Sequence, residues 1–362
     1  MRRVIVAAGG TGGHFYPGMA VAQALKARGW EPLMVVREAD AALPLLETEG
    51  VAALPVDLRG LPRRPGPELF AFAWKLAGGV LLLSRALKAF RPDLVLGMGG
   101  YLTAPLACAA WRLGVPSAAH ESNAILGLAN RTAAGLGAKI FWGLPPRDGL
   151  GTVVGTPVRP ALWTRREPGE ARRALGLDAA RPTLLAFGGS QGAKGINENL
   201  PAALRDLSLP ALQVLHLAGR SKADEVRAAY RAAGLSADVR EYLDDMGAAY
   251  AAADLVVCRS GASTLAELHA QRKPALLIPY PHAAADHQDA NARVFEKSGA
   301  AVRLREDELG GRLGALLADL LKSSGAAIKR AKMAEACERL DLPSAEKTTG
   351  KFVLELEKLS RA

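Results

Sequence analysis

A short apolar run followed at once by a cluster of glycines occurs in both halves of this chain of 362 residues. In the first half, Val4 to Ala8 leads into the glycine-rich segment 9–14, and a helical pattern follows. In the second half, Thr183 to Phe187 leads into a similar segment at 188–192. Each arrangement predicts a strand, a tight turn and a helix. The repeated feature therefore favours an open parallel α/β sheet in each half of the chain.

The remaining periodic segments support two such sheets. The chain is too long for one ordinary core, and its second half restarts the pattern after a turn-rich junction at 155–160. We expect domains at 1–155 and 156–340, with a last helix near 345–360 in the segment 341–362. Further strands are expected at 33–36, 51–56, 94–96, 116–119, 140–142, 213–217, 239–242, 255–258 and 275–279, and helices at 17–28, 69–90 and 104–113.

Composition narrows the class of protein. The net charge of +10 suggests an anionic partner, which could be nucleic acid, a membrane surface or a phosphorylated substrate. The three cysteines lie among small apolar residues and form no metal-binding pattern. No signal peptide is expected, because the first apolar run is short. The apolar stretch 70–83 is interrupted and falls short of the roughly 20 residues needed to cross a bilayer, so we expect a soluble or peripheral protein.

The glycine-rich segment 9–14 suits phosphate binding, because glycines let backbone N–H groups approach a ligand at a helix N-terminus. It is neither a Walker loop nor a good dinucleotide fingerprint, since no Gly-Lys-Ser/Thr follows and Phe15 replaces the third glycine. A tight turn without a ligand is the alternative. His14 ends the segment and is a candidate base or substrate contact, against the alternative of an ordinary surface histidine.

Two segments in the second half repeat this chemistry. Ser190, in the glycine-rich segment 188–193, can donate to a phosphate or cap the next helix. Residues 258–267 predict a strand, a turn of small residues and a helix start, where a diphosphate could bind the helix N-terminus. Glu267 could hold the two hydroxyls of a ribose, or could merely complement the helix dipole.

Three further polar segments follow predicted strands. In the loop and helix at 279–292, Gln288 and Asn291 are three residues apart and so share a helix face, and their carboxamides suit sugar hydroxyls. Residues 120–124 place polar groups at the carboxyl end of another strand. Residues 99–101 form a glycine turn that could shape the acceptor side.

Seven motifs stand in an order and spacing typical of one family. They are Gly-Gly-Thr-Gly-Gly-His at 9–14, Gly-Gly-Tyr at 99–101, His-Glu-x-Asn-Ala at 120–124, Gly-x-Pro-Val-Arg at 155–159, Gly-Gly-Ser-Gln-Gly-Ala at 188–193, Arg-Ser-Gly-Ala-x-Thr-x-x-Glu at 259–267 and His-Gln-x-x-Asn-Ala at 287–292. Together they resemble the MurG family, bacterial enzymes that add N-acetylglucosamine to lipid I. The resemblance runs from residue 5 to about 300. It implies the GT-B architecture, in which two Rossmann-like parallel-sheet domains face across a cleft and the C-terminal helix returns to the first domain.

The resemblance also implies site residues for a UDP-N-acetylglucosamine (UDP-GlcNAc) donor. The backbone of Leu243 would meet uracil, and Glu267 would hold the ribose hydroxyls. The N-acetylglucosamine would contact Asn123 and Gln288, although loop-length variation leaves His287 as an alternative to Gln288. The loop of Thr11, Gly12 and Gly13 would also contact the N-acetylglucosamine. The diphosphate would be held by Arg159, Ser190 and the turn of Ala262, Ser263 and Thr264, and the substrate-binding stretch would continue through Leu265 and Ala266.

The implied reaction is an inverting displacement at the sugar anomeric carbon. The 4-hydroxyl of the muramoyl sugar of lipid I would attack, UDP would leave and lipid II would form in peptidoglycan synthesis, with consequences for cell shape and division. Donors aimed at the leaving diphosphate, with Arg159, should contribute most. The sequence contains no Asp-x-Asp, which argues against a metal clamp, and we expect no cofactor. His14 is the first candidate for the general base and Glu121 the second.

Lipid I is membrane-bound, so the resemblance implies a peripheral enzyme at the cytoplasmic face of the bacterial plasma membrane. Arg63, Arg64, Lys75, Arg85 and Lys88 surround Leu69, Phe70, Phe72, Trp74 and Leu76. A basic rim around exposed aromatics would bind an anionic bilayer. The alternative is an ordinary helix core with a solvated basic face.

Other functions remain as alternatives. The donor-side motifs would also serve another lipid glycosyltransferase of this fold or a UDP-GlcNAc 2-epimerase, which would need no acceptor. The motifs at 99–101 and 120–123 favour the MurG-type acceptor. We do not expect a nucleic-acid partner, because the lysines and arginines are dispersed and no nucleic-acid-binding motif occurs.

Overall fold

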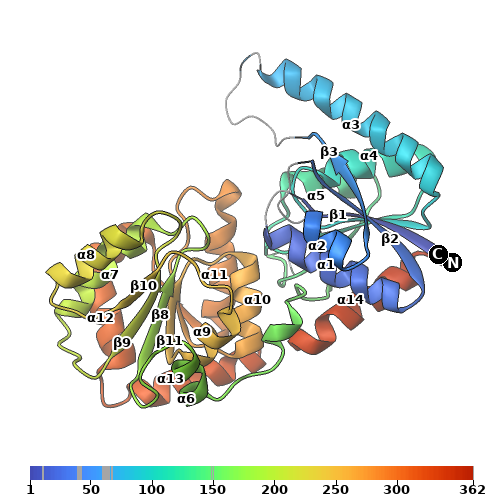
Figure 1. The fold of residues 1–362 in the computed structure, drawn as a ribbon. Helices are drawn as coiled ribbons and strands as arrows, with labels where there is room; N and C mark the ends of the chain where they lie inside the picture. Colours follow the sequence, from blue (N-terminus) through green and yellow to red (C-terminus); the bar gives the residue numbers. More distant parts are fainter. Residues whose placement is uncertain are drawn as a thin grey trace. The chain divides into compact units, whose positions relative to one another are not determined.

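The computed structural model describes residues 1–9, 12–38, 43–58, 66, 68–147, 149 and 151–361, with the backbone alone at 68 and 69. The chain divides into two compact units (Figure 1). Unit 1 comprises residues 1–159 and 342–362, and unit 2 comprises residues 160–341. Each unit contains one parallel sheet with helices on both of its faces, so the two Rossmann-like domains predicted from the sequence are confirmed.

The described residues of unit 1 form a seven-stranded sheet in the order β3-β2-β1-β4-β5-β6-β7. Every neighbouring pair of strands is parallel. The strands are β1 (Arg2–Ala7), β2 (Trp30–Arg37), β3 (Ala52–Val56), β4 (Leu94–Gly97), β5 (Ser117–Glu121), β6 (Lys139–Trp142) and β7 (Thr152–Val153). The helices are α1 (Gly12–Ala27), α2 (Leu43–Thr48), α3 (Glu68–Phe90), α4 (Thr103–Leu113), α5 (Leu128–Gly135) and α14 (Ala345–Leu359).

The central strand β1 is apolar on both sides because helices cover both faces of its sheet. Val4 and Val6 belong to the core cluster that α1 and α14 complete, whereas Ile5 and Ala7 belong to the cluster beneath α3 and α4. All four side chains are fully buried. Alternation along one strand thus divides the core of unit 1 into two layers.

The C-terminal helix α14 completes the first of these layers. Phe352, Val353 and Leu356 are fully buried beside residues of α1. On the surface of the same helix pair, Arg28 forms an ion pair with Glu357 at 3.0 Å. Unit 1 therefore contains both ends of the chain.

Unit 2 repeats the arrangement with a six-stranded parallel sheet, in the order β10-β9-β8-β11-β12-β13 over its residues 160–341. The strands are β8 (Thr183–Phe187), β9 (Gln213–Leu217), β10 (Asp238–Arg240), β11 (Leu255–Cys258), β12 (Ala275–Leu277) and β13 (Ala301–Arg303). The helices are η1 (Pro160–Leu162), α6 (Pro168–Ala174), α7 (Lys194–Arg205), α8 (Ala223–Ala232), α9 (Met246–Ala252), α10 (Ala262–Gln271), η2 (Ala284–Asp286), α11 (His287–Ser298), η3 (Glu306–Glu308), α12 (Leu309–Leu321) and α13 (Ala326–Glu338).

Helix α3 agrees with the helix expected at 69–90, but its apolar stretch is longer than expected. That stretch was expected to end near Leu83 and to be too short to cross a bilayer, whereas the 21-residue segment Phe70–Phe90 contains an 18-residue window with a mean hydropathy of 1.4. By length and composition this segment could cross a membrane, which is weak evidence when only one such helix is found in the described residues. Leu83 and Leu87 are buried in the core of unit 1, so one face of α3 packs against the rest of that unit.

Candidate active site

The glycine-rich loops lie where both sheets reverse their strand order. In each sheet the first strand, β1 or β8, lies between the second and the fourth strands of its unit. Ligands of open α/β sheets bind beyond the carboxyl ends of the strands at such a switch point. The loops after β1 and β4 in unit 1, and after β8 and β11 in unit 2, occupy these positions. Four of the predicted motifs therefore stand where the fold favours a ligand.

His14, in the first turn of α1, packs against the loop that follows β4. A Cβ atom on Gly100 would lie 3.0 Å from Cδ2 of His14, and one on Gly99 would lie 3.2 Å from Nε2. Both glycines have a positive φ, +91° and +71° for Gly99 and Gly100, so larger residues would be strained as well as crowded. The glycine turn at 99–101 thus makes room for the imidazole ring.

The electrostatic surroundings of His14 suit a general base. Burial lowers its pKa from the ordinary value of 6.5, and the nearby charge of Glu121 raises it by a smaller amount. The lowered pKa keeps the imidazole neutral near pH 7, and a neutral ring can accept a proton.

Glu121 is almost fully buried and has hydrogen bonds to both carboxylate oxygens. Oε1 accepts from the backbone N–H of Asn123 at 3.0 Å and from its Nδ2 at 2.9 Å. Oε2 accepts from the backbone N–H of Gly127 at 2.9 Å and from Nδ2 of Asn130 at 2.8 Å. Four donors on one carboxylate indicate that Glu121 shapes the loop and orients Asn123. This geometry favours His14 over Glu121 as the base.

His120 lies inside β5, fully buried, and not in the loop after it as the sequence suggested. Its Nε2 is 2.9 Å from the carbonyl oxygen of Gly155. Burial lowers its pKa to about 4, so it is neutral. This contact with Gly155 therefore links the end of β5 to the segment that contains Arg159. The Arg159 guanidinium lies over the ring of Tyr16, 5.4 Å from its centroid, which assigns Arg159 to unit 1 beside the start of α1.

The second glycine-rich loop is shaped by close backbone packing. A Cβ atom on Gly192 would lie 2.0 Å from the carbonyl oxygen of Ala218, and one on Gly219 would lie 2.2 Å from the backbone nitrogen of Gly192. The loops after β8 and β9 therefore touch through their backbones. Ser190 is exposed at the tip of this loop. It does not cap α7, whose N-cap residue is Ala193, so the phosphate role is the prediction that remains for Ser190.

The start of α10 offers unpaired backbone donors. Its N-cap residue, Gly261, has an extended backbone, and no side chain caps the helix. The first N–H bonded within the helix is that of Leu265, which donates to the Gly261 carbonyl oxygen at 3.0 Å. The N–H groups of residues 262–264 thus form a site suited to an anion. The side chains of Leu265 and Ala266 face the core, which leaves their backbones for any contact with substrate.

Glu267 lies in the second turn of α10, because the helix begins at Ala262. This position weakens the alternative that it complements the helix dipole, since that effect fades beyond the first turn. Its Oε2 accepts a hydrogen bond of 2.8 Å from the hydroxyl of Tyr250, on α9. No sequence motif predicts this partner, because Tyr250 is 17 residues away on another helix.

Gln288 is fixed at the start of α11 through both its backbone and its side chain. Ser260 donates to its carbonyl oxygen at 2.8 Å, and its Oε1 accepts from the Tyr280 backbone N–H at 3.0 Å. The carboxamide therefore presents its Nε2 as the donor group. In contrast, Asn291 is fully buried and donates to the Ser260 carbonyl oxygen at 3.2 Å. The structure therefore does not support the suggestion that its carboxamide contacts a sugar. The neighbouring His287 is half-buried, and its Nδ1 lies 2.7 Å from the Ala284 carbonyl oxygen.

For the remaining predicted residues that the structure describes, it shows their position in the fold but no contact that bears on their role. Leu243 is half-buried in the connection from β10 to α9, at the carboxyl edge of the sheet. Gly12 and Gly13 open α1, and Thr11 lies outside the described residues. Among the described residues, no three His, Cys, Asp or Glu side chains are gathered as metal ligands.

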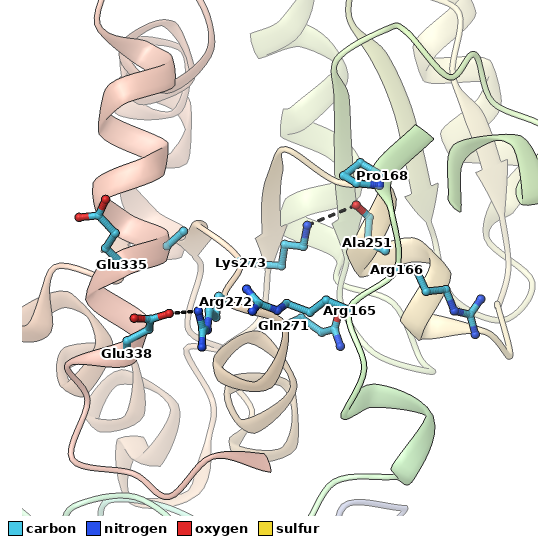
Figure 2. Close-up of a pocket in the computed structure, with 10 residues that line it drawn as sticks. Arg165, Arg166, Pro168, Ala251, Gln271, Arg272, Lys273, Glu335 and Glu338 are labelled. Carbon is cyan, nitrogen blue, oxygen red and sulfur yellow. Dashed lines mark hydrogen bonds and ion pairs between the residues drawn. The ribbon is translucent and has the colours of Figure 1, made fainter. Parts of the chain in front are cut away.

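A pocket of about 370 Å³ lies elsewhere in unit 2 (Figure 2). It is lined by Arg165, Lys273 and Glu335, among others, and Arg272 at its rim forms an ion pair with Glu338. Lys273 donates to the carbonyl oxygens of Ala251, in the last turn of α9, and of Ala253, directly after that helix. The pocket is at the amino-terminal side of β11 and β12 and contains no predicted site residue, so it is not part of the candidate active site.

Two family models match the chain. The glycosyltransferase family 28 N-terminal domain matches residues 4–142, and the family 28 C-terminal domain matches residues 183–347. The UDP-N-acetylglucosamine--N-acetylmuramyl-(pentapeptide) pyrophosphoryl-undecaprenol N-acetylglucosamine transferase of Halorhodospira halophila is 42% identical over 352 residues, which cover 95% of this chain and 96% of that protein. The chain belongs to this transferase family.

Other comparisons agree. The transferase of the same name from Acidithiobacillus ferrooxidans is 43% identical over 311 residues, 84% of this chain and 85% of that protein. The crystal structure of Acinetobacter baumannii MurG has a TM-score of 0.80 at 28% identity, over 99% of this chain and 100% of that one. A Streptomyces glycosyltransferase, SsfS6, complexed with thymidine diphosphate has a TM-score of 0.60 at 18% identity, covering 99% of this chain and 100% of that one, and so shares the fold alone. The family predicted from the seven motifs is confirmed.

Proposed function

We propose that this protein transfers N-acetylglucosamine from UDP-GlcNAc to the 4-hydroxyl of the muramoyl sugar of lipid I, giving lipid II and UDP. The observation that carries the proposal is the match, over nearly the whole chain, to a transferase named for an N-acetylmuramyl-pentapeptide pyrophosphoryl-undecaprenol acceptor. This reaction is a step of peptidoglycan synthesis. We expect its loss to impair cell shape and division.

The proposed mechanism is a single displacement with inversion at the anomeric carbon. The acceptor 4-hydroxyl forms the new glycosidic bond while the bond to the UDP oxygen breaks. His14 takes the hydroxyl proton, and its low pKa means that it is neutral and ready to do so. Negative charge grows on the leaving diphosphate, where the N–H groups at the start of α10 and the guanidinium of Arg159 stabilise it.

The donor is held by groups of fixed geometry. Glu267 accepts the ribose hydroxyls, and the Gln288 carboxamide donates to the N-acetylglucosamine. Asn123, oriented by Glu121, contacts the same sugar. The backbone of Leu243 meets uracil, and Ser190 with the Gly12–Gly13 segment completes the contacts to the diphosphate and sugar.

The deciding experiment incubates the purified protein with labelled UDP-GlcNAc, with and without a short-chain lipid I analogue. UDP release and product mass are measured. Acceptor-dependent UDP release with one N-acetylhexosamine added, in the β configuration, is the expected result. UDP-GlcNAc binding without transfer would move the acceptor to another lipid, and epimerised donor in the absence of acceptor would replace the proposal with a 2-epimerase. No binding of UDP-GlcNAc would overturn it.

We further propose that the enzyme works as a peripheral protein on the cytoplasmic face of the plasma membrane, attached through α3. Phe70 and Trp74 are each 83% exposed, although such side chains usually avoid water. Leu81 and Leu82 extend this exposed apolar face, and exposed Arg85 and Lys88 follow on the same helix. This combination supports insertion of the apolar face among anionic headgroups.

The other residues predicted for this surface contribute less to it. Phe72 and Leu76 are half-buried, and Lys75 is exposed but forms an ion pair with Asp57 at 2.6 Å. Arg63 and Arg64 lie outside the described residues, as does the side chain of Leu69.

Vesicle sedimentation tests the membrane proposal. Binding to phosphatidylglycerol vesicles, weaker binding to neutral phosphatidylcholine vesicles and partial release by salt are expected. Equal recovery in the supernatant with both vesicle types would contradict it.

A further inference from the structure

Tyr250 is a buried side chain whose polar end meets the predicted donor site. It lies on α9, its residue is fully buried, and its hydroxyl donates to Oε2 of Glu267 at 2.8 Å. Glu267 is only partly buried. The tyrosine therefore supports, from inside the protein, a carboxylate that reaches the surface of unit 2.

The ring of Tyr250 is fixed by a neighbour from the central strand. It packs edge-on against Phe187, with the ring centroids 6.0 Å apart. Phe187 is the last residue of β8, directly before the glycine-rich loop that carries Ser190. The hydroxyl of Tyr250 thus occupies a defined point relative to the switch point of the sheet, and a hydrogen bond to a charged acceptor is among the stronger ones in proteins.

Fixing one carboxylate oxygen restricts rotation of the whole carboxylate group. A ribose presents two neighbouring hydroxyls, and a carboxylate receives both well only when its plane is correctly turned. A rigid group built to accept a hydroxyl also discriminates against a ligand without it, because the mismatch leaves buried polar atoms unpaired. A mobile carboxylate would instead turn toward water and lose this discrimination.

We propose that Tyr250 is a positioning residue that holds Glu267 in the orientation for ribose, and that this pair makes the donor site selective for ribonucleotides over 2′-deoxyribonucleotides. This inference rests on the proposed role of Glu267 in binding the donor ribose. Tyr250 itself touches neither substrate, and its effect passes through the carboxylate.

The test is Tyr250→Phe, which removes only the hydroxyl, with Tyr230→Phe as the matched control. Tyr230 is another buried tyrosine of unit 2, and its hydroxyl bonds to Nδ1 of His216 at 3.0 Å, in the core cluster of the unit. Calorimetry measures the Kd of UDP and of 2′-deoxy-UDP, so the readout does not depend on transfer. Thermal melts of both variants measure any general loss of stability.

We expect UDP to bind the unchanged protein about tenfold or more tightly than 2′-deoxy-UDP, a difference typical of one lost hydrogen bond to a charged group. In Tyr250→Phe the Kd of UDP should rise about tenfold, with little change for 2′-deoxy-UDP, so the selectivity largely disappears. Tyr230→Phe should lower stability without altering the ratio of the two Kd values. Once Glu267→Ala is present, adding Tyr250→Phe should have no further effect on either Kd.

The outcomes separate this inference from the proposed function. A Tyr250→Phe protein with unchanged selectivity, or effects of Tyr250→Phe and Glu267→Ala that add, would overturn the positioning role while leaving the transferase proposal intact. Failure of the unchanged protein to bind UDP would overturn the donor site itself, and with it both proposals. Equal loss of selectivity in both tyrosine variants would show a general structural effect and also refute the inference.

Discussion

His14 and Glu121 are close enough for the charge of one to affect the other, yet their surroundings suit them to different chemistry. His14 is a half-buried imidazole with a lowered pKa, packed against a glycine turn that leaves it room. Glu121 accepts hydrogen bonds from three residues and forms the frame of its loop. The first is equipped to take a proton, and the second to hold Asn123 in place.

Replacing His14 with alanine should lower kcat by about 10²- to 10⁴-fold, the usual contribution of a general base. Donor KM should change little, because the proton transfer belongs to the transition state. In the unchanged enzyme, activity should fall as the pH drops through the pKa of His14, and because burial lowers that pKa this decline lies below pH 6.5. Initial rates between pH 4.5 and 9 measure both effects. A His14→Ala enzyme with the original kcat would remove His14 from the mechanism.

Glu121→Gln should act on the loop instead. The new NH₂ group would face N–H donors in place of one carboxylate oxygen, at an expected cost of about 1–3 kcal/mol in the free energy of unfolding. Sugar binding should weaken as Asn123 loses its support. The acid-side decline of the pH–rate profile should persist but move to lower pH, because the charge of Glu121 no longer raises the pKa of His14. Chemical denaturation and the pH profile test this together. Disappearance of the acid-side decline in Glu121→Gln would instead indicate that Glu121 is the base.

Individual elements show why some predictions succeeded and others failed. The strands β8, β9 and β11 have the bounds expected from the sequence, because central parallel strands are continuous apolar runs. The edge strands β7 and β13 were missed, since two or three residues carry no periodic signal. Helix α1 begins at Gly12 and not near Pro17, because its first turn contains the glycines that the pattern suggested were loop.

The candidate site was predictable only where a motif lies in one stretch of sequence. Sequence motifs could propose His14, Ser190, Glu267 and Gln288 because each motif encodes a turn together with a polar side chain. The contacts that orient them are tertiary. Tyr250 meets Glu267 only because α9 and α10 pack together, and no spacing along the chain reveals that meeting.

The two faces of α3 should respond oppositely to mutation. Leu83→Ala removes a fully buried side chain and should cost about 2–5 kcal/mol in the free energy of unfolding, with vesicle binding retained in the folded fraction. Trp74→Ala changes an exposed side chain, so stability should stay within about 0.5 kcal/mol while binding to phosphatidylglycerol vesicles falls. Denaturant titration and sedimentation compare the pair. Strong destabilisation by Trp74→Ala would mean that this face packs against protein.

The glycine loop after β8 offers a second matched pair. Gly192→Ala places a Cβ atom 2.0 Å from the Ala218 carbonyl oxygen, so the loops after β8 and β9 must separate. Gly189→Ala meets nothing within 4 Å, although both glycines have a positive φ. Gly192→Ala should therefore destabilise unit 2 well beyond the roughly 1–2 kcal/mol of φ strain expected for Gly189→Ala. Equal melting temperatures for the two variants would contradict this close packing.

At the scale of the whole molecule, each unit buries one neutral histidine in its core. Burial lowers the pKa of His120 in unit 1 and of His216 in unit 2 to about 4. Between that value and the ordinary 6.5, the unfolded chain binds more protons than the folded one. The free energy of unfolding should therefore decrease as the pH falls from about 6.5 to 4, by on the order of 1 kcal/mol per pH unit for each histidine.

Urea titrations at pH 7, 6 and 5 test this dependence. His216→Asn should flatten the pH dependence of unit 2 and leave that of unit 1 in place, although the variant should be less stable at pH 7 because the bond to Tyr230 is lost. Unchanged urea midpoints between pH 7 and 5 would show that neither histidine is kept neutral by folding.

The return of α14 to unit 1 has a consequence for how the protein is made. Unit 2 is one continuous stretch of sequence, so all of its residues are synthesised before residues 342–362. Unit 1, although begun first, lacks Phe352, Val353 and Leu356 in its core until these residues have been synthesised. Until then the nascent chain should expose the apolar residues of α1 against which α14 packs in the folded protein. Unit 1, which we propose binds the membrane, is therefore the last domain to complete its core.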